Sequence, residues 1–157
     1  MHSHNGFSLI ELMVVIAIIA IIAGIGVPSF RNLTLDSRLN STANHLLGAL
    51  RLARSEAITL RTNITVCAAN ESNSACANGT NWTDGMLLLN GAEVIRVIPA
   101  AASGLTITSS HGSAAFRANG TLSPSSLVLT IGETERSKSH AVKVNAIGQA
   151  CSGSACP

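Results

Sequence analysis

The sequence is poor in aromatic and charged residues. Tyrosine is absent, aromatic residues make up only 3% of the chain, and charged residues make up 11%. Much of the 46% hydrophobic fraction is alanine or lies in one apolar run near the N-terminus, so the remainder has few bulky side chains for a core. This composition favours a small domain attached to a membrane segment over a free enzyme.

Sequence motifs of common enzyme classes are also missing. No glycine-rich phosphate loop follows an expected strand, and neither a His-Glu-x-x-His motif nor a nucleophile elbow occurs. His45, His111 and His140 are scattered along the chain. We therefore expect a protein that is not an enzyme and that has no catalytic residues, metal site or cofactor.

The apolar run near the N-terminus contains one carboxylate. Leu9–Val27 spans about 19 residues, close to the roughly 20 that a membrane-spanning helix needs. Glu11 lies near its start, where an ionisable group costs several kcal/mol unless it has a partner or a function. An ordinary signal peptide could be cleaved at Gly24-Ile25-Gly26, but Met1–Gly6 lacks Lys and Arg. A plain membrane anchor would leave Glu11 unexplained.

A third interpretation accounts for the carboxylate. Residues 6–11 read Gly-Phe-Ser-Leu-Ile-Glu, which resembles the signature of type IV pilins and type II secretion pseudopilins. The resemblance implies a leader of residues 1–6, cleaved after Gly6 by a prepilin peptidase, and N-methylation of Phe7. Residues 7–30 would then form the transmembrane and assembly half of a long helix. His2 and His4 stand where such leaders usually carry Lys or Arg.

The position of Glu11 suits filament assembly. After cleavage it would be the fifth residue, counted from Phe7. A carboxylate there can neutralise the N-terminal amine of a neighbouring subunit, and a charge away from water is tolerated only when it is paired. Such a pair would also set the axial register of subunits. Further along, Gly24, Gly26 and Pro28 predict a break or kink in the helix.

The next segment has the periodicity of an amphipathic helix. Apolar residues recur at alternating steps of four and three, which places them on one stripe: Leu39, Ala43, Leu46, Leu50, Ala53, Ala57 and Leu60. Arg51, Arg54 and Arg61 lie off this stripe, and we interpret them as a solvated face. We expect the helix to end near Arg61, before the β-branched run that starts at Ile64.

Beyond residue 62 the pattern changes to short β-prone runs separated by turn residues. Asn90-Gly91 predicts a two-residue type I′ hairpin, and Asn119-Gly120 and Ile131-Gly132 predict later turns. A helix followed by consecutive strands indicates an α+β fold with the helix across an antiparallel sheet. The expected strands are Ile64–Ala68, Met86–Asn90, Val94–Ile98, Leu105–Thr108, Ala114–Arg117, Leu127–Ile131 and Ala141–Ala146.

Four cysteines form two local pairs, Cys67 with Cys76 and Cys151 with Cys156. Four cysteines can hold zinc, but neither spacing has the tight form usual for a metal site. Outside the bacterial cytoplasm disulfides are favoured, and three connectivities are possible. We expect the two local pairs, because each closes a short loop rich in Asn, Ser or Gly.

Several motifs resemble the GspH/FimT branch of pseudopilins and minor pilins. They are Ala53-Arg54-Ser55-Glu56-Ala57-Ile58, Val66-Cys67, Cys76 and Trp82-Thr83-Asp84-Gly85. The resemblance implies a pilin-like fold, with residues 31–157 as a periplasmic domain anchored in the bacterial inner membrane. It also implies a structural subunit that helps to prime and cap a type IV pilus or a type II secretion pseudopilus, near the tip. The implied partners are other minor and major subunits, a prepilin peptidase, the inner-membrane assembly platform and, before assembly, lipid.

DNA binding for natural transformation is the alternative function. Beyond residue 30 there are ten Lys and Arg against seven Asp and Glu, an excess too small to predict nucleic-acid binding. DNA-binding FimT-like pilins use a C-terminal Gly-Arg-x-Arg segment, whereas this chain has Gly148-Gln149-Ala150-Cys151. The remaining candidates for phosphate contact are Arg136, Lys138 and Lys143.

Overall fold

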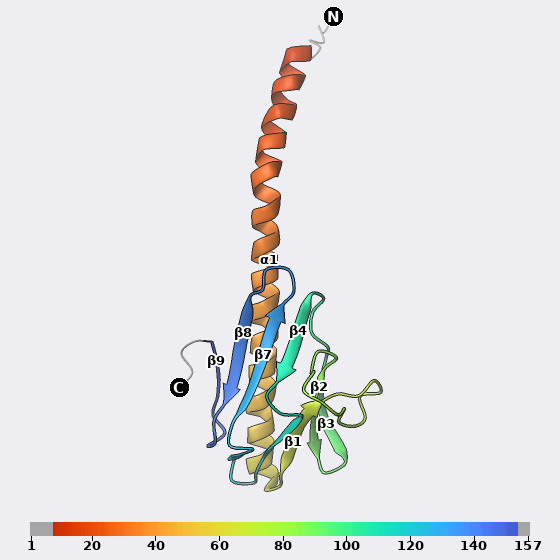
Figure 1. Cartoon of the computed structure of the whole chain (residues 1–157), viewed down its shortest axis with the longest axis vertical. Helices are drawn as coiled ribbons and strands as arrows, with labels where there is room; N and C mark the ends of the chain where they lie inside the picture. Colours follow the sequence, from red (N-terminus) through yellow and green to blue (C-terminus); the bar gives the residue numbers. More distant parts are fainter. Residues whose placement is uncertain (1–7, 154–157) are drawn as a thin grey trace, which may run out of the picture. The chain divides into compact units, whose positions relative to one another are not determined.

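The computed structural model describes residues 8–153 and begins with one long helix (Figure 1). Helix α1 spans Leu9–Leu60 without interruption. The chain divides into two compact units, Met1–Ser37 and Arg38–Pro157, and α1 contributes residues to both. Within the first unit, the large apolar side chains up to Phe30 are exposed. Burial along the helix begins at Leu35, four residues before the predicted amphipathic stripe.

The end of α1 lies where the sequence predicts it. Arg61 has a φ of 54°, and the N–H of Thr62 donates to the carbonyl of Ala57 at 3.2 Å. This six-to-one bond after a left-handed residue is a Schellman motif, which satisfies a carbonyl at the helix end. The chain can then reverse into the first strand.

Within the described residues nine strands follow, and every pairing between them is antiparallel. They form a five-stranded sheet in the order β3-β2-β1-β5-β6 and a four-stranded sheet in the order β4-β7-β8-β9. The α+β prediction is confirmed, although the strands form two sheets where one was expected. The strands are β1 (Ile64–Ala68), β2 (Met86–Asn90), β3 (Glu93–Ile98), β4 (Leu105–Ser109), β5 (Ser113–Phe116), β6 (Leu122–Ser123), β7 (Leu127–Glu133), β8 (Ser139–Val144) and β9 (Ala150–Ser152).

The core of the second unit lies between α1 and the inner faces of both sheets (Figure 1). The predicted helical stripe is buried from Leu39 to Ala57, whereas Leu60, at the helix end, is 49% exposed. The strands contribute alternate residues, as half-buried strands do; Leu127, Leu129 and Ile131 of β7 are fully buried. Trp82 is 1% exposed and packs in the same core.

Two turn predictions are wrong in detail. The β2–β3 hairpin exists, but Asn90 pairs with Glu93, so Gly91 and Ala92 form its two-residue loop. Of these two residues only Gly91 has a positive φ, 61°. This fits a type II′ turn, which needs a positive φ only at its first central residue. Gly132 lies inside β7, paired with both β4 and β8. Strand pairing on both sides overrides its turn propensity.

Candidate assembly site

The first turn of α1 holds the carboxylate singled out by the sequence. The carbonyl of Ser8 accepts hydrogen bonds from the N–H groups of Glu11 at 3.1 Å and Leu12 at 3.2 Å. The Ser8 hydroxyl also accepts from the N–H of Glu11, at 3.4 Å. Ser8 is thus the N-cap, and Glu11 lies where the helix dipole favours negative charge. The Ser-x-x-Glu spacing signals this cap, and sequence reasoning missed it.

The Glu11 side chain itself has no partner among the described residues. It is exposed, and no charged residue follows it until Arg31. By length and composition α1 could cross a membrane. A lone carboxylate in such an apolar segment needs a partner from outside the described chain.

The other residues expected to act in this segment are placed only in part. Gly6 and Phe7 lie outside the described residues, so cleavage and methylation remain predictions. Helix α1 is continuous through Gly24, Gly26 and Pro28, so the chain is not interrupted there, and the expected kink stays a prediction. A proline removes one backbone donor, and here the flanking turns keep the helix continuous. A Cβ at Gly24 or Gly26 would meet nothing within 4 Å.

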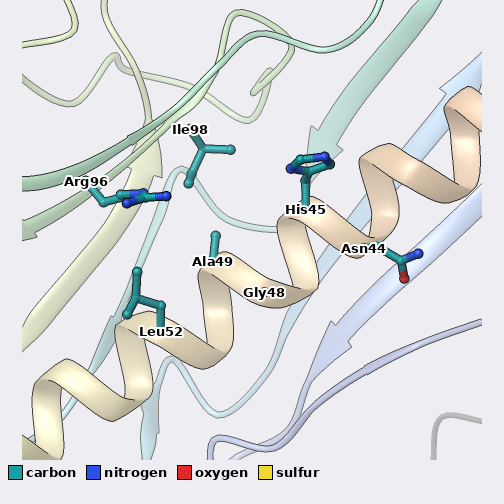
Figure 2. Close-up of a pocket in the computed structure, with 7 residues that line it drawn as sticks. All are labelled: Asn44, His45, Gly48, Ala49, Leu52, Arg96 and Ile98. Atoms are coloured by element: carbon teal, nitrogen blue, oxygen red, sulfur yellow. The ribbon is translucent and has the colours of Figure 1, made fainter.

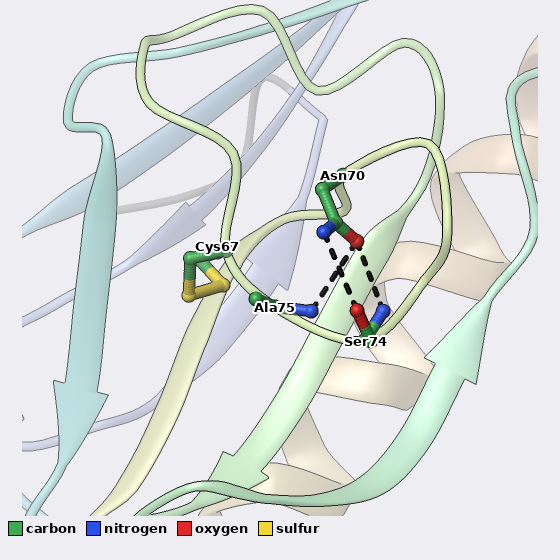
Figure 3. Close-up of a disulfide and its surroundings, with 5 residues drawn as sticks. Cys67, Asn70, Ser74 and Ala75 are labelled. Atoms are coloured by element: carbon green, nitrogen blue, oxygen red, sulfur yellow. Dashed lines mark hydrogen bonds between the residues drawn. A yellow bond between two sulfur atoms is a disulfide. The ribbon is translucent and has the colours of Figure 1, made fainter.

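The Cys67–Cys76 disulfide is confirmed (Figure 3). Cys67 is fully buried in β1, and Cys76 lies on the exposed loop that returns to it. Asn70 organises this loop: its side-chain oxygen accepts from the N–H groups of Ser74 at 2.9 Å and Ala75 at 3.2 Å. The disulfide withdraws two thiolates from any zinc site. Among residues 8–153, no group of three or more His, Cys, Asp or Glu could hold a metal ion.

The second predicted disulfide is placed at one end only. Cys151 in β9 is disulfide-bonded. Cys156, its predicted partner, lies outside the described residues, so this pairing stays a prediction.

The basic residues proposed for DNA contact do not form one free patch. The Arg136 Nε lies 2.7 Å from the Glu133 Oε2, and the Glu133 side chain is fully buried. Lys138 also has an interaction within the structure. Lys143, half-buried in β8, pairs across the sheet with Val128 and Cys151. Glu133 therefore engages one of the cations that phosphate would need.

One arginine has a structural role that the sequence did not indicate. The Arg54 Nε donates to the carbonyl oxygen of Gly120 at 3.1 Å, across 66 residues of sequence. The interpretation of Arg54 as part of a solvated face is wrong, because its half-buried guanidinium joins α1 to the turn after β5. Gly148 approaches the same turn so closely that a Cβ there would collide with the Gly120 carbonyl. Asn119-Gly120 does form the predicted turn, with the Gly120 N–H bonded to Arg117.

Comparison with known families agrees with the fold and the N-terminal motif. Residues 42–148 match the family model described as type II transport protein GspH. The chain belongs to the GspH family. Residues 1–27 of this GspH-family chain also match the prokaryotic N-terminal methylation motif. The members of this family are structural pilins and pseudopilins, and the chain has their apolar N-terminal helix. No curated protein matches the chain significantly.

Solved structures of at least two proteins share the fold. The type IV minor pilin FimU of Pseudomonas aeruginosa PAO1 is 23% identical, with a TM-score of 0.61, over 76% of this chain and 90% of FimU. The minor pseudopilin EpsH of the type 2 secretion system of Vibrio cholerae is 14% identical, with a TM-score of 0.55, over 73% of this chain and 95% of EpsH. The pilin-like fold is therefore shared with a pilus subunit and with a secretion subunit.

Proposed function

We propose that this GspH-family chain is a minor pilin or pseudopilin that helps to prime and cap a type IV pilus or a type II secretion pseudopilus. Prepilin peptidase removes residues 1–6 after Gly6, and Phe7 becomes the methylated N-terminus. Residues 7–30 hold the chain in the bacterial inner membrane, with residues 31–157 in the periplasm. The subunit then enters a filament, near its tip.

The observation that carries this proposal is the unpartnered carboxylate of Glu11. It lies in the first turn of a helix whose following residues are uncharged up to Arg31. In lipid or in a dry filament core, this charge requires a cation. The N-terminal amine that cleavage exposes on a neighbouring subunit is such a cation, so insertion pairs the two.

The chain meets its partners in a definite order under this proposal. Lipid surrounds the apolar part of α1 first, because its large side chains are exposed in the isolated chain. The peptidase acts next, followed by the inner-membrane assembly platform. Other minor and major pilins or pseudopilins then replace lipid around the helix, and Glu11 meets its amine at that step.

The test is a Glu11→Gln variant in cells that make the prepilin peptidase and the filament. Cleavage after Gly6 should persist, measured by intact mass. Incorporation into sheared filaments should fall at least about tenfold, since 1.4 kcal/mol of lost pairing corresponds to that factor. Glu71→Gln, at an exposed position in the loop between β1 and β2, is the matched control. Unchanged incorporation of Glu11→Gln would overturn the proposed role of the carboxylate.

DNA uptake is not favoured by any contact in the described residues. Its best candidate cation, Arg136, is engaged by Glu133. We expect the full-length chain in detergent to give no salt-sensitive gel shift with duplex DNA at low micromolar concentration. A clear shift that disappears as salt is raised would reverse this ranking.

A further inference from the structure

A groove in the second unit lies between α1 and the edge strand β3 (Figure 2). Its volume is about 380 Å³, and its walls come from two elements. Helix α1 supplies Asn44, His45, Gly48, Ala49 and Leu52, while β3 supplies Arg96 and Ile98. Gly48 has no side chain, and a Cβ there would meet nothing within 4 Å. The groove is therefore open along its helical wall.

The register of β3 shows why Arg96 and Ile98 face this groove. Arg96 pairs with Leu88 and Ile98 with Met86, and opposite residues in an antiparallel pair share a face. Leu88 and Met86 both belong to the core beneath α1. Arg96 thus projects from the sheet face that packs against α1. The residue is nevertheless exposed, so α1 does not cover this part of the face.

One backbone edge of β3 has no strand partner within the described residues. β3 is the last strand of its sheet and pairs only with β2. No other backbone hydrogen bond among residues 8–153 involves Glu93–Ile98. Such an edge is a template for an added strand. Two features restrict which strand can add: a bulge between Leu88 and Leu89 on the partner strand, and the charge of Arg96 on the inner face.

The charge of the groove points to the chemistry of its occupant. Arg96 and His45 are both exposed, and neither has a hydrogen-bond or ion-pair partner among the described residues. Figure 2 shows them on opposite sides of the space above Ala49 and Leu52. An added strand with an apolar residue over Ala49 and a carboxylate opposite Arg96 would satisfy both the apolar floor and the unpaired guanidinium.

We propose that the β3–α1 groove binds an extended, carboxylate-bearing segment of a neighbouring subunit by strand addition. This inference rests on the proposed function, because it assumes that the chain assembles with other subunits. The segment pairs its backbone with β3 and directs alternate side chains into the groove. Arg96 acts as the selector: it disfavours strands without a carboxylate at the matching position and strengthens those that have one.

The test uses purified full-length protein in detergent and a labelled eight-residue peptide. The peptide alternates valine with threonine and has one central glutamate. We expect saturable binding by fluorescence anisotropy, with slower amide hydrogen exchange in Glu93–Ile98. Two altered peptides serve as probes of mechanism. Replacing the glutamate with lysine should weaken binding about tenfold, and replacing a central residue with proline should abolish it, because proline cannot donate to the ladder.

Three protein variants distinguish the groove from the rest of the surface. Arg96→Glu should weaken binding of the glutamate peptide about tenfold and favour the lysine peptide. Gly48→Leu should abolish binding by filling the groove, while raising helix propensity. Arg117→Glu, the same charge change at an exposed arginine outside the groove, should have no effect.

Each failure has a distinct meaning. Absence of binding, or binding that Arg96→Glu and Gly48→Leu leave unchanged, would overturn the inference. Binding without protection of the β3 amides would overturn strand addition. Because peptide binding is measured without a filament, failure of the Glu11→Gln test would leave this result intact, and the reverse also holds.

Discussion

The two units of the chain differ in the exposure of their large apolar side chains. Between Leu9 and Phe30, the large apolar side chains are 43% to 77% exposed. In the second unit, Leu50, Phe116 and Leu129 are fully buried in one core. The second unit therefore buries its own hydrophobic side chains. Those of the first unit can be removed from water only by surroundings outside the chain.

This difference separates stability from assembly. The exposed apolar surface of the first unit suits lipid and then neighbouring helices, so substitutions there should change insertion and incorporation. The core of the second unit sets its free energy of unfolding. The single Trp82, 1% exposed within that core, reports on the second unit alone. Variants matched across the two units can test whether the separation is real.

The largest contrast is expected between Leu50→Ala and Ile18→Ala. Leu50 is fully buried and Ile18 is 51% exposed. Leu50→Ala should lower the free energy of unfolding of the second unit by about 2–5 kcal/mol, because it leaves a cavity. Ile18→Ala should leave it unchanged. Urea unfolding of full-length protein in detergent, followed by Trp82 fluorescence, measures both. Equal losses in the two variants would contradict the separation.

The disulfide should have the next largest effect, and only in the second unit. The Cys67→Ala/Cys76→Ala variant frees a loop with a sequence separation of 9. We expect the free energy of unfolding to fall by about 2–3 kcal/mol, because the unfolded chain gains entropy when a short loop is opened. Ser72→Ala, in the exposed part of the same loop, is the control. A stability equal to the parent's would show that the hydrogen bonds of Asn70 suffice to order the loop.

The sequence predicted the elements that carry a strong local pattern. The buried helical stripe and β1 and β2 were obtained from periodicity, and five further strands were found with shifted ends. β6 and β9 were missed because two and three residues are too few to show alternation. The division into two sheets was also missed. It depends on which strands meet in space, and no local pattern encodes that.

The candidate sites also divide into those that a local sequence pattern reveals and those that depend on which segments meet in space. Glu11 could be identified from sequence, because a charge in an apolar run is visible without a structure. Arg54 could not be, since its partner is a backbone carbonyl 66 residues away. Arg136 was interpreted as a candidate DNA contact, and the structure pairs it with buried Glu133. The β3–α1 groove required the strand order, which only the fold supplies.

Arg54→Met should lower the free energy of unfolding by less than Leu50→Ala or removal of the Cys67–Cys76 disulfide. The variant keeps the apolar stem but removes the hydrogen bond to Gly120. Because Arg54 is half-buried, we expect a loss of about 1 kcal/mol in the free energy of unfolding. Arg51→Met, at an exposed position one turn earlier on α1, should change little. If the two variants behave alike, the contact between α1 and the Gly120 turn contributes no stability.

The smallest contrast uses one substitution at two glycines. Gly91 has a φ of 61° in the β2–β3 turn, so Gly91→Ala should lower the free energy of unfolding of the second unit by about 1 kcal/mol. Gly24 is helical, and a Cβ there meets nothing within 4 Å. Gly24→Ala should therefore favour helix by about 0.5–1 kcal/mol, seen as greater helicity by circular dichroism, without moving the Trp82 transition. A Trp82 transition that shifted with Gly24→Ala would show that the helix of the first unit and the core of the second unfold together.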